Sequence, residues 1–229
     1  MAELIIDQLS VSYGKVQVLE NVQFRVASGE VVGLIGGNGA GKSTTLRAVS
    51  GVIQRSSGSV TVDSVTVRAR AESASRAGIS HVPEGRRLFA NLTVDQNLRL
   101  GALAAGHDLK RADFERFYTH FPACKELGGR RAAALSGGEQ QMIAILRGLA
   151  AKPKFLMVDE VCLGLAPIVV DNLVESMIQV AAEFSLGLLL VDQNVTMLKK
   201  TCNRIYILHN GKTKEMSGTD EDLRSVYFD

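Results

Sequence analysis

A glycine-rich stretch near the N-terminus has the residue types and spacing that bind phosphate groups. With the residue that follows, it reads Gly36, Gly37, Asn38, Gly39, Ala40, Gly41, Lys42, Ser43 and Thr44. Glycines let backbone N–H groups turn toward a phosphate, Lys42 reaches the β- and γ-phosphates, and the Ser43 hydroxyl binds Mg²⁺. An apolar run at 30–35 precedes the stretch and a helical segment at about 42–49 follows it, so a helix N-terminus adds its positive end. We therefore expect this phosphate loop to bind ATP and Mg²⁺.

Two adjacent acids close a second apolar run. Residues 155–158 are apolar and are followed by Asp159 and Glu160. At the end of a buried strand, Asp159 can hold Mg²⁺, and Glu160 can orient or deprotonate the attacking water. Taken alone, the same residues could form a strand that ends in a solvated acidic turn. Together with the phosphate loop, they predict a hydrolytic site with Glu160 as its base.

The segment at 135–140 combines a helix start with two glycines. Ser136 and Glu139 have the spacing of a capping box. That pattern does not explain Gly137 and Gly138, which weaken a first helical turn. Bare glycine N–H groups at a helix start make an anion site. Because this segment lies far along the chain from the phosphate loop, we expect it to contact ATP bound by another subunit.

The composition bounds the possible classes of protein. A hydrophobic content of 46% over 229 residues is enough for a packed core. The net charge of +2 gives no support for a nucleic-acid partner. Cys124, Cys162 and Cys202 are odd in number and lack metal-ligand spacing, so neither a disulfide framework nor a zinc site is expected. The N-terminus does not read as a signal peptide, and the apolar runs are too short to span a bilayer.

Alternating patterns predict the elements that position these residues. Period-2 alternation at 9–13, 22–26 and 60–62 indicates strands with one buried face. Continuous apolar runs at 30–35, 155–158 and 188–191 indicate central strands, which alternate with a helix at 168–183. Thr93 and Gln96 form a capping box that opens a helical stretch to about 121, and a second helix covers 137–151. A hairpin is expected across Asn210-Gly211.

These elements predict an α/β fold in one domain at 1–229. It has a phosphate-loop core and an antiparallel β flank, and a helical subdomain is inserted at about 86–150.

The chain closely resembles the ATP-binding subunits of ABC transporters over nearly its whole length. Residues 135–140, Leu-Ser-Gly-Gly-Glu-Gln, look like the signature of that family and are called the signature segment below. The resemblance implies a P-loop NTPase core of the ABC ATPase type and Mg²⁺-dependent ATP hydrolysis in a head-to-tail dimer. Tyr13 matches the aromatic residue that stacks on adenine. Residues 164–167 lie where the family has its D-loop.

A narrower resemblance links the chain to the shorter ATPase of branched-chain amino acid importers. Residues 82–89, 92–94, 164–167 and 191–194 carry it. It implies a second, different ABC ATPase subunit, two transmembrane permease subunits and an extracytoplasmic solute-binding protein. It also implies a cytoplasmic location, peripheral on the inner face of the cell membrane. Urea and short-amide importers are similar, and a soluble ABC ATPase without a transport role is a further alternative.

Several positions depart from the usual family pattern. Val161 and Cys162 follow the catalytic acid where Pro and Ser are usual, and Gly37 replaces a usual Pro. Glu84 and Gln193 stand where most ABC ATPases have Gln and His. Both variants look normal for the narrower subfamily. We expect Glu84 to join Ser43 and Asp159 as a metal ligand, and Gln193 to act beside Glu160 in the catalytic site.

Overall fold

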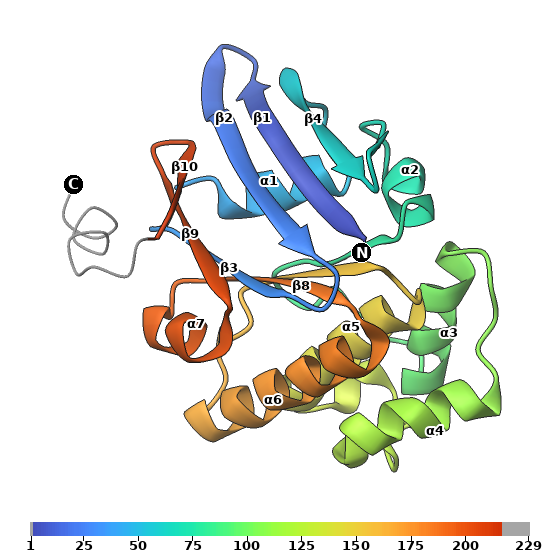
Figure 1. Cartoon of the computed structure of the whole chain (residues 1–229). Coiled ribbons are helices and arrows are strands. Elements are labelled where there is room, and N and C mark those ends of the chain that lie inside the picture. The colour runs from blue at the N-terminus through green and yellow to red at the C-terminus, as the bar shows by residue number, and fades with distance from the viewer. Residues whose placement is uncertain (1, 217–229) are drawn as a thin grey trace.

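Two β-sheets lie one above the other in the structure, a computed structural model that describes residues 2–216 (Figure 1). The smaller sheet is antiparallel and has the strand order β2-β1-β4-β5. Its strands are β1 (Glu3–Tyr13), β2 (Val16–Ala27), β4 (Ser57–Val62) and β5 (Val65–Thr66). Apolar residues alternate along β1 and β2 and are buried on one face. The antiparallel flank expected from the sequence is therefore confirmed.

The larger sheet has the strand order β10-β9-β3-β8-β7-β6. Its strands are β3 (Val31–Ile35), β6 (Ile79–Val82), β7 (Phe155–Asp159), β8 (Gly187–Asp192), β9 (Arg204–His209) and β10 (Lys212–Glu215). All neighbouring pairs are parallel except β9 with β10. Every residue of β3, β7 and β8 is buried, which is why these strands read as continuous apolar runs. Because β3, β7 and β8 are in register, the loops that follow them leave one edge of the sheet together.

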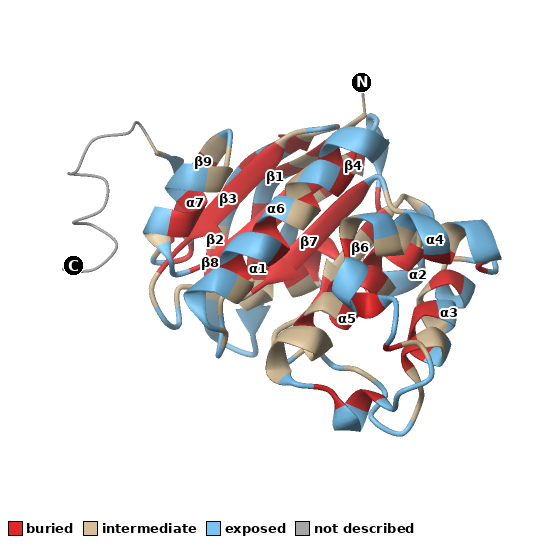
Figure 2. Ribbon diagram, turned by 90° about the horizontal axis from the view of Figure 1, so that it is seen from below, coloured by how far each residue is buried: buried red, intermediate tan, exposed pale blue. Residues whose placement is uncertain are grey.

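The larger sheet separates two hydrophobic cores. Helix α1 (Lys42–Val49) packs between the sheets in a core that includes Leu46, Phe24 of β2 and Val191 of β8. The opposite face of the larger sheet packs against helices α5 (Gly137–Ala150) and α6 (Pro167–Phe184) in a second core. Figure 2 shows the buried strands of this sheet in red. Consequently α1 and α5 lie against opposite faces of one sheet.

The remaining helices gather around the second core and the sheet edges. They are α2 (Ala71–Arg76), α3 (Val94–Ala104), α4 (Arg111–His120) and α7 (Val195–Thr201), with short 3-10 turns at Pro122–Cys124 and Ala132–Ala134. Helix α3 packs on α5, where a Cβ on Gly101 would lie 2.2 Å from the Arg147 carbonyl oxygen. Glycine at this position allows the two helices to approach closely.

The structure corrects the expected course of residues 93–121. The capping box is present, since the Thr93 side chain accepts from Gln96 N–H and the Gln96 side chain accepts from Thr93 N–H. The helix that it opens ends at Ala104, however, and α4 begins only at Arg111. A turn with Gly106 at φ +85° follows α3, and a left-handed backbone cannot continue a right-handed helix. The boundaries of a helical subdomain at about 86–150 stay a prediction.

Candidate nucleotide-binding and hydrolysis site

The phosphate loop connects β3 to α1 in a conformation that depends on its glycines. Gly39 and Gly41 have φ values of +80° and +103°. A Cβ on Gly41 would lie 2.6 Å from Leu19 Cδ2, and one on Gly36 would lie 2.5 Å from the Leu208 carbonyl oxygen. Side chains are therefore excluded by backbone angle and by space. Within the loop, the Ala40 N–H donates to the Gly37 carbonyl oxygen at 3.3 Å. The start of α1, with Ser43 and Thr44, presents the N-terminal end of a helix to a phosphate.

Lys42 lies at the centre of this loop. Its Nζ donates to the carbonyl oxygens of Gly36 at 2.8 Å and Gly37 at 2.9 Å. Burial lowers the pKa of Lys42, and the nearby carboxylates of Glu160 and Asp159 act in the opposite direction. The ammonium group is thus bonded to the loop itself, within the electrostatic influence of the acids, and a bound phosphate would take over hydrogen bonds now made to the loop carbonyls.

Asp159 ends β7 with one oxygen in need of a partner. Its Oδ1 is buried and has no hydrogen-bond partner among the described residues. Burial, together with the charges of Glu160 and Glu84, raises the pKa of Asp159 to about 6, against a hydrogen bond from Ser43 that lowers it. A divalent cation beside Asp159 would satisfy the orphaned oxygen and offset this excess of negative charge. The residues present therefore fit Mg²⁺.

A Mg²⁺ ion beside Asp159 would take its other oxygen ligands mainly from groups that are not acidic side chains. Within residues 2–216, no group of three His, Cys, Asp or Glu side chains is placed to hold a metal ion. Mg²⁺ commonly binds one or two carboxylates and takes further oxygens from substrate phosphates and water. Asp159 and the Ser43 hydroxyl fit that pattern.

Glu84 lies after β6 and pairs with α1. Its Oε1 is 3.3 Å from Nη2 of Arg47. The charge of Glu84 still acts on Asp159, so the carboxylate is near the acidic end of β7. The contact with Arg47 uses Oε1 alone, so the second oxygen of the carboxylate could face a metal, and the role of Glu84 as a metal ligand stays a prediction.

Glu160 and Gln193 follow neighbouring strands, β7 and β8. Glu160 has φ +53°, and its N–H donates to the Val191 carbonyl oxygen at 2.8 Å. A non-glycine residue held in this region costs on the order of 1–3 kcal/mol, a strain that is found disproportionately at functional sites. Gln193 Nε2 donates to Asn38 Oδ1 of the phosphate loop at 2.8 Å. The structure therefore brings Gln193 to the phosphate loop and Glu160 to the adjacent strand end.

Tyr13 ends β1 and is 48% exposed, where it pairs with Val16 across the β1–β2 hairpin. A ring that is half exposed at a strand end can stack on a flat base. Its role at the adenine stays a prediction.

The signature segment opens α5 with the expected capping box. Ser136 Oγ accepts from Glu139 N–H at 3.4 Å, and Glu139 Oε2 accepts from Ser136 N–H at 2.6 Å. The Ser136 backbone hydrogen bond is the main reason that the pKa of Glu139 is lowered. The glycines also have local packing neighbours: a Cβ on Gly137 would lie 3.1 Å from Arg86, and one on Gly138 would lie 3.0 Å from Val169. Close packing within the chain therefore supplies a second reason for these glycines.

Comparisons with known proteins agree with this geometry. The family model described as ABC transporter matches residues 19–162. The chain belongs to the ABC transporter family. The high-affinity branched-chain amino acid transport ATP-binding protein BraG of Pseudomonas aeruginosa is 42% identical, over 91% of this chain and 90% of BraG. The lipopolysaccharide export system ATP-binding protein LptB of Escherichia coli is 35% identical, over 100% of this chain and 98% of LptB.

Solved structures give the same assignment. The ATP-binding subunit of an ABC transporter superposes with a TM-score of 0.79 at 32% identity, covering 96% of this chain and 91% of that structure. A nucleotide-free ATP-binding cassette superposes with a TM-score of 0.85 at 22% identity, which shows the shared fold. This ABC protein is thus an ATPase subunit coupled to transport, as expected from its sequence. Among its described residues no helix is long and apolar enough to cross a bilayer.

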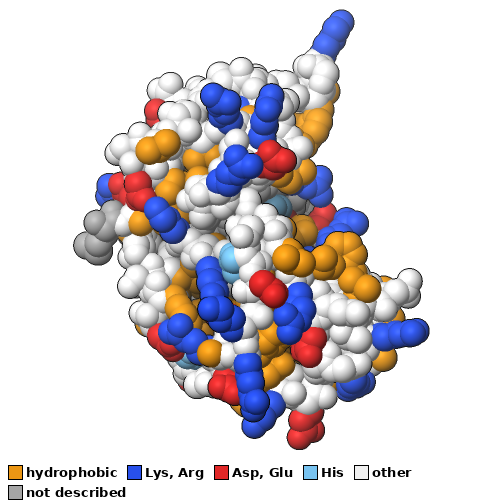
Figure 3. Space-filling view, turned by 90° about the vertical axis from the view of Figure 1, so that its right-hand side faces the viewer, with side chains coloured by type: hydrophobic (Ala, Val, Ile, Leu, Met, Phe, Trp, Pro, Cys, Tyr) orange, Lys and Arg blue, Asp and Glu red, His pale blue; other side chains and the backbone are white. Residues whose placement is uncertain are grey.

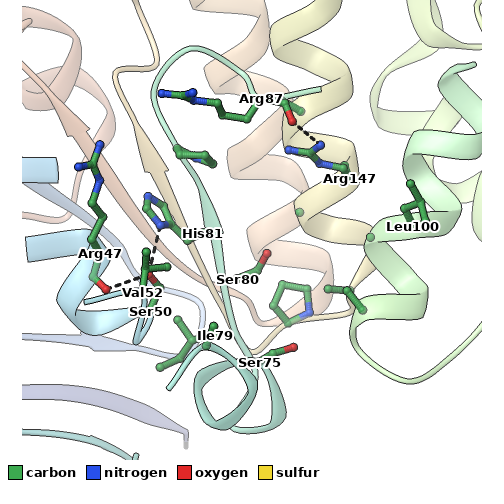
Figure 4. Close-up of a pocket in the computed structure, with 18 of the residues that line it drawn as sticks. Arg47, Ser50, Val52, Ser75, Ile79, Ser80, His81, Arg87, Leu100 and Arg147 are labelled. Atoms are coloured by element: carbon green, nitrogen blue, oxygen red, sulfur yellow. Dashed lines mark hydrogen bonds between the residues drawn. The ribbon is translucent and has the colours of Figure 1, made fainter. Parts of the chain in front are cut away.

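A groove of about 800 Å³ opens on the ABC subunit between α1, β6, α3 and α5. His81 and Ser50 meet at its floor, and Arg87 and Arg147 lie on one side (Figure 4). Val52, Phe89 and Leu103 line it with more than half of each residue exposed. Seen from this side, hydrophobic and basic side chains lie next to each other on the surface (Figure 3). The segment at 83–89 could also be read from its sequence as a turn with Phe89 in the core, but Phe89 is 54% exposed, so that interpretation is wrong.

Sequence reasoning did not predict the contacts that Arg147 and Arg86 of the ABC subunit make in this region. Arg147 of α5 donates to the carbonyl oxygens of Arg87 at 2.6 Å and Arg86 at 3.3 Å. The side chain of Arg86 reaches the first turn of α5, where Nη1 donates to Gln140 Oε1 at 3.3 Å. Arg147 lies among apolar residues of α5 at helical spacing, and nothing in that pattern indicates that its side chain binds two backbone carbonyl oxygens.

Proposed function

We propose that this ATPase subunit powers an importer of branched-chain amino acids. The observation that carries the proposal is the 42% identity with BraG across nine-tenths of both chains. A second relative, the probable branched-chain amino acid transport ATP-binding protein LivF of Archaeoglobus fulgidus, is 28% identical over 94% of this chain. Export of lipopolysaccharide is the second candidate, supported by the full-length match to LptB at 35% identity.

The phosphate loop is proposed to hold the ATP that this subunit binds. Lys42 and the backbone N–H groups of the loop contact the phosphates, and Tyr13 stacks on the adenine. Ser43 and Asp159 are proposed to hold Mg²⁺, with Glu84 as a further ligand. Bound there, Mg²⁺ would neutralise charge on the phosphate oxygens.

Hydrolysis is proposed to depend on the two residues that follow β7 and β8. Glu160 accepts a proton from, or orients, the water that attacks the γ-phosphate. Gln193 is held by Asn38 at 2.8 Å and positions the same reactants through its amide. An amide cannot act as a proton shuttle, so the proton transfer falls to Glu160.

The signature segment is proposed to contact the ATP of a second, different ABC ATPase subunit. In support of this, α1 and α5 pack on opposite faces of the larger sheet, so their N-terminal ends belong to different parts of the surface. We infer a heterodimer beneath two transmembrane permease subunits, fed by an extracytoplasmic solute-binding protein. The subunit would then lie on the cytoplasmic face of the membrane, held there by its permeases.

Uptake in the host cell tests the proposed cargo. Cells that lack this chain are expected to lose energy-dependent uptake of radiolabelled leucine, isoleucine and valine. Uptake should return with the wild-type chain and not with Lys42→Ala. Normal uptake of all three amino acids together with loss of lipopolysaccharide from the cell surface would favour the second candidate. Purification from detergent extract, followed by identification of the membrane proteins that accompany the chain, gives an independent answer.

A further inference from the structure

The turn that borders the groove has an unusual backbone. Gly85, Arg86 and Arg87 have successive φ values of +71°, +64° and +49°. L side chains rarely adopt this region, and two in a row need support from their surroundings. Arg147 gives that support by donating to the carbonyl oxygens of both arginines, as the dashed line to Arg87 in Figure 4 shows. Helix α5 therefore holds the turn in its strained form.

The side chain of Arg86 leads from this turn to the start of the same helix. Its guanidinium donates to Gln140 Oε1 at 3.3 Å and lies 3.1–3.5 Å from the place of a Cβ on Gly137. It is also 3.9 Å from the corresponding position of Gly164, which follows β7 in the expected D-loop. One side chain thus joins the turn to the signature segment and approaches a third loop.

A contribution to the stability of the fold does not explain why the Arg86 guanidinium lies beside the N-terminus of α5. A cation beside a helix N-terminus is unfavourable, because that end of the helix is already positive. Within residues 2–216, Arg86 donates to a neutral amide and forms no ion pair with a carboxylate. The contact therefore combines a strained backbone with an unfavourable charge, which is typical of a residue kept for function.

The other end of the turn reaches the groove. Phe89 is exposed there, while its backbone N–H donates to Oδ1 of the fully buried Asn97 at 2.9 Å and its carbonyl accepts from Asn97 Nδ2 at 3.1 Å. The ring of Phe89 lies 5.7 Å from the guanidinium of Arg147. Residues 85–89 therefore form one braced unit, with Phe89 in the groove and Arg86 at the signature segment.

We propose that Arg86 is a positioning residue that links the binding of a partner in the groove to the position of the signature segment. It does so by fixing the first turn of α5 relative to residues 85–89. The proposal rests on the proposed function, in which the signature segment contacts the ATP of the partner subunit. Loss of Arg86 would leave ATP binding at this chain's own phosphate loop intact. It would slow hydrolysis of the ATP that the partner holds.

Three variants separate this role from its alternatives. In the transporter purified with its membrane subunits, Arg86→Met and Arg86→Lys should each lower ATP turnover at saturating ATP at least tenfold. KM for ATP should stay within twofold. Lysine should not restore turnover, because one ammonium group cannot replace the planar guanidinium that lies between Gln140 and Gly137. Arg86→Gly should lower turnover equally while Tm falls by less than about 2 °C, because glycine removes the φ strain. Arg76→Met, at an exposed arginine of α2, is the control and should behave as wild type.

Hydrogen exchange in the isolated chain without nucleotide supplies a readout independent of ATPase activity. In Arg86→Met, the peptide covering 135–141 should exchange at least fivefold faster, while the peptide covering 36–44 is unchanged. Unchanged exchange at 135–141 would overturn the proposal, as would a Lys variant with normal turnover, which would point to a charge effect on phosphate. Failure of the wild-type chain to bind ATP would instead count against the proposed function, because the exchange measurement needs no nucleotide.

Discussion

Single residues in the loops after the central strands are proposed to carry the chemistry of this ABC subunit, and Lys42, the first residue of α1, is one of them. Its ammonium group has hydrogen-bond partners within its own loop, the carbonyl oxygens of Gly36 and Gly37. A bound triphosphate would replace neutral acceptors by charged ones, and hydrogen bonds to charged groups are the stronger kind.

Lys42→Ala should therefore weaken ATP binding. The lost charge-assisted contact is worth about 1.5–3 kcal/mol, so affinity should fall by about tenfold or more. Isothermal calorimetry with ATP measures this directly. Lys199→Ala, at an exposed lysine of α7, serves as the matched control. Equal affinities in the Lys42 variant and the wild type would contradict the assignment of the phosphate loop.

Glu160 and Gln193 should differ in how much they contribute to hydrolysis. Gln193→Ala removes a neutral amide, so the barrier should rise by about 1–2 kcal/mol. Glu160→Gln removes the proposed proton acceptor and should cost substantially more. Single-turnover hydrolysis, with one site mutated at a time in the heterodimer, compares the two. The ranking is wrong if Gln193→Ala abolishes turnover as completely as Glu160→Gln.

His81 should make the fold sensitive to mild acid. Its Nδ1 is 3.2 Å from Ser50 Oγ, and its Nε2 is buried with no partner among the described residues. Burial, aided by the charge of Arg47, lowers the pKa of His81 to about 4 from the usual 6.5. Between these values the unfolded chain binds a proton that the folded chain does not, so stability falls as pH decreases through this window.

His81→Gln tests this pH dependence. From pH 7 to pH 5 the wild type should lose about 2 kcal/mol of unfolding free energy through His81 alone, and the variant should lack this contribution. Urea unfolding of both proteins at the two pH values gives the difference. If the two proteins lose equal stability, the protonation of His81 is not linked to unfolding.

At the scale of elements, the position of Phe89 in the groove suggests that it contacts another protein. An apolar ring with more than half of its surface in solvent, beside arginines, suits a protein interface. We predict that residues 83–89 contact the permease subunits.

Phe89→Asp should abolish transport while the isolated subunit keeps its ATPase activity and its fold. The exposed ring makes few core contacts, so its loss should change Tm little, and a carboxylate in the groove should oppose docking. Uptake in cells and ATPase activity of the purified chain are the two measurements. Val65→Asp, at an exposed apolar residue of β5, is the control. Loss of folding in Phe89→Asp would contradict the prediction.

Sequence patterns predicted the elements in which burial follows a simple rule along the whole element. Strands β3, β7 and β8 are buried on both faces, so an uninterrupted apolar run is enough to reveal them. Helix α7 and strand β6 were missed because they are short, and β6 is fixed by its pairing with β7 rather than by a pattern of its own.

The candidate site follows the same division. Residues of the phosphate loop, Glu160 and Gln193 could be brought together from the sequence because each directly follows a recognisable strand. The contacts of Arg86 could not, since they depend on two left-handed residues and on hydrogen bonds from Arg147, which lies 61 residues farther along the chain. Contacts with residues that are distant in the sequence stabilise such conformations, and local sequence propensities do not predict those contacts.

At the scale of the whole molecule, the placement of the phosphate loop and of the signature segment, both proposed to contact ATP, predicts dimerisation that depends on ATP. Glu160→Gln should bind ATP without hydrolysing it, which keeps the nucleotide between two subunits. Sedimentation of this variant with ATP and its natural partner ATPase should show a stable heterodimer, whereas the chain alone without ATP should associate weakly. Adding Lys42→Ala should weaken the heterodimer. A heterodimer equally stable without nucleotide would contradict an ATP-dependent interface.

The strand order also governs when the fold can be completed during synthesis. Strand β3 lies between β8 and β9, so its apolar residues at 31–35 gain both neighbours only after residues 187–209 have been made. The β1–β2 hairpin and β4 can pair much earlier. A growing chain therefore carries an unpaired hydrophobic strand, next to the phosphate loop, for most of its translation. Such a segment is open to aggregation, and its protection on the ribosome falls to chaperones or to the nascent antiparallel sheet.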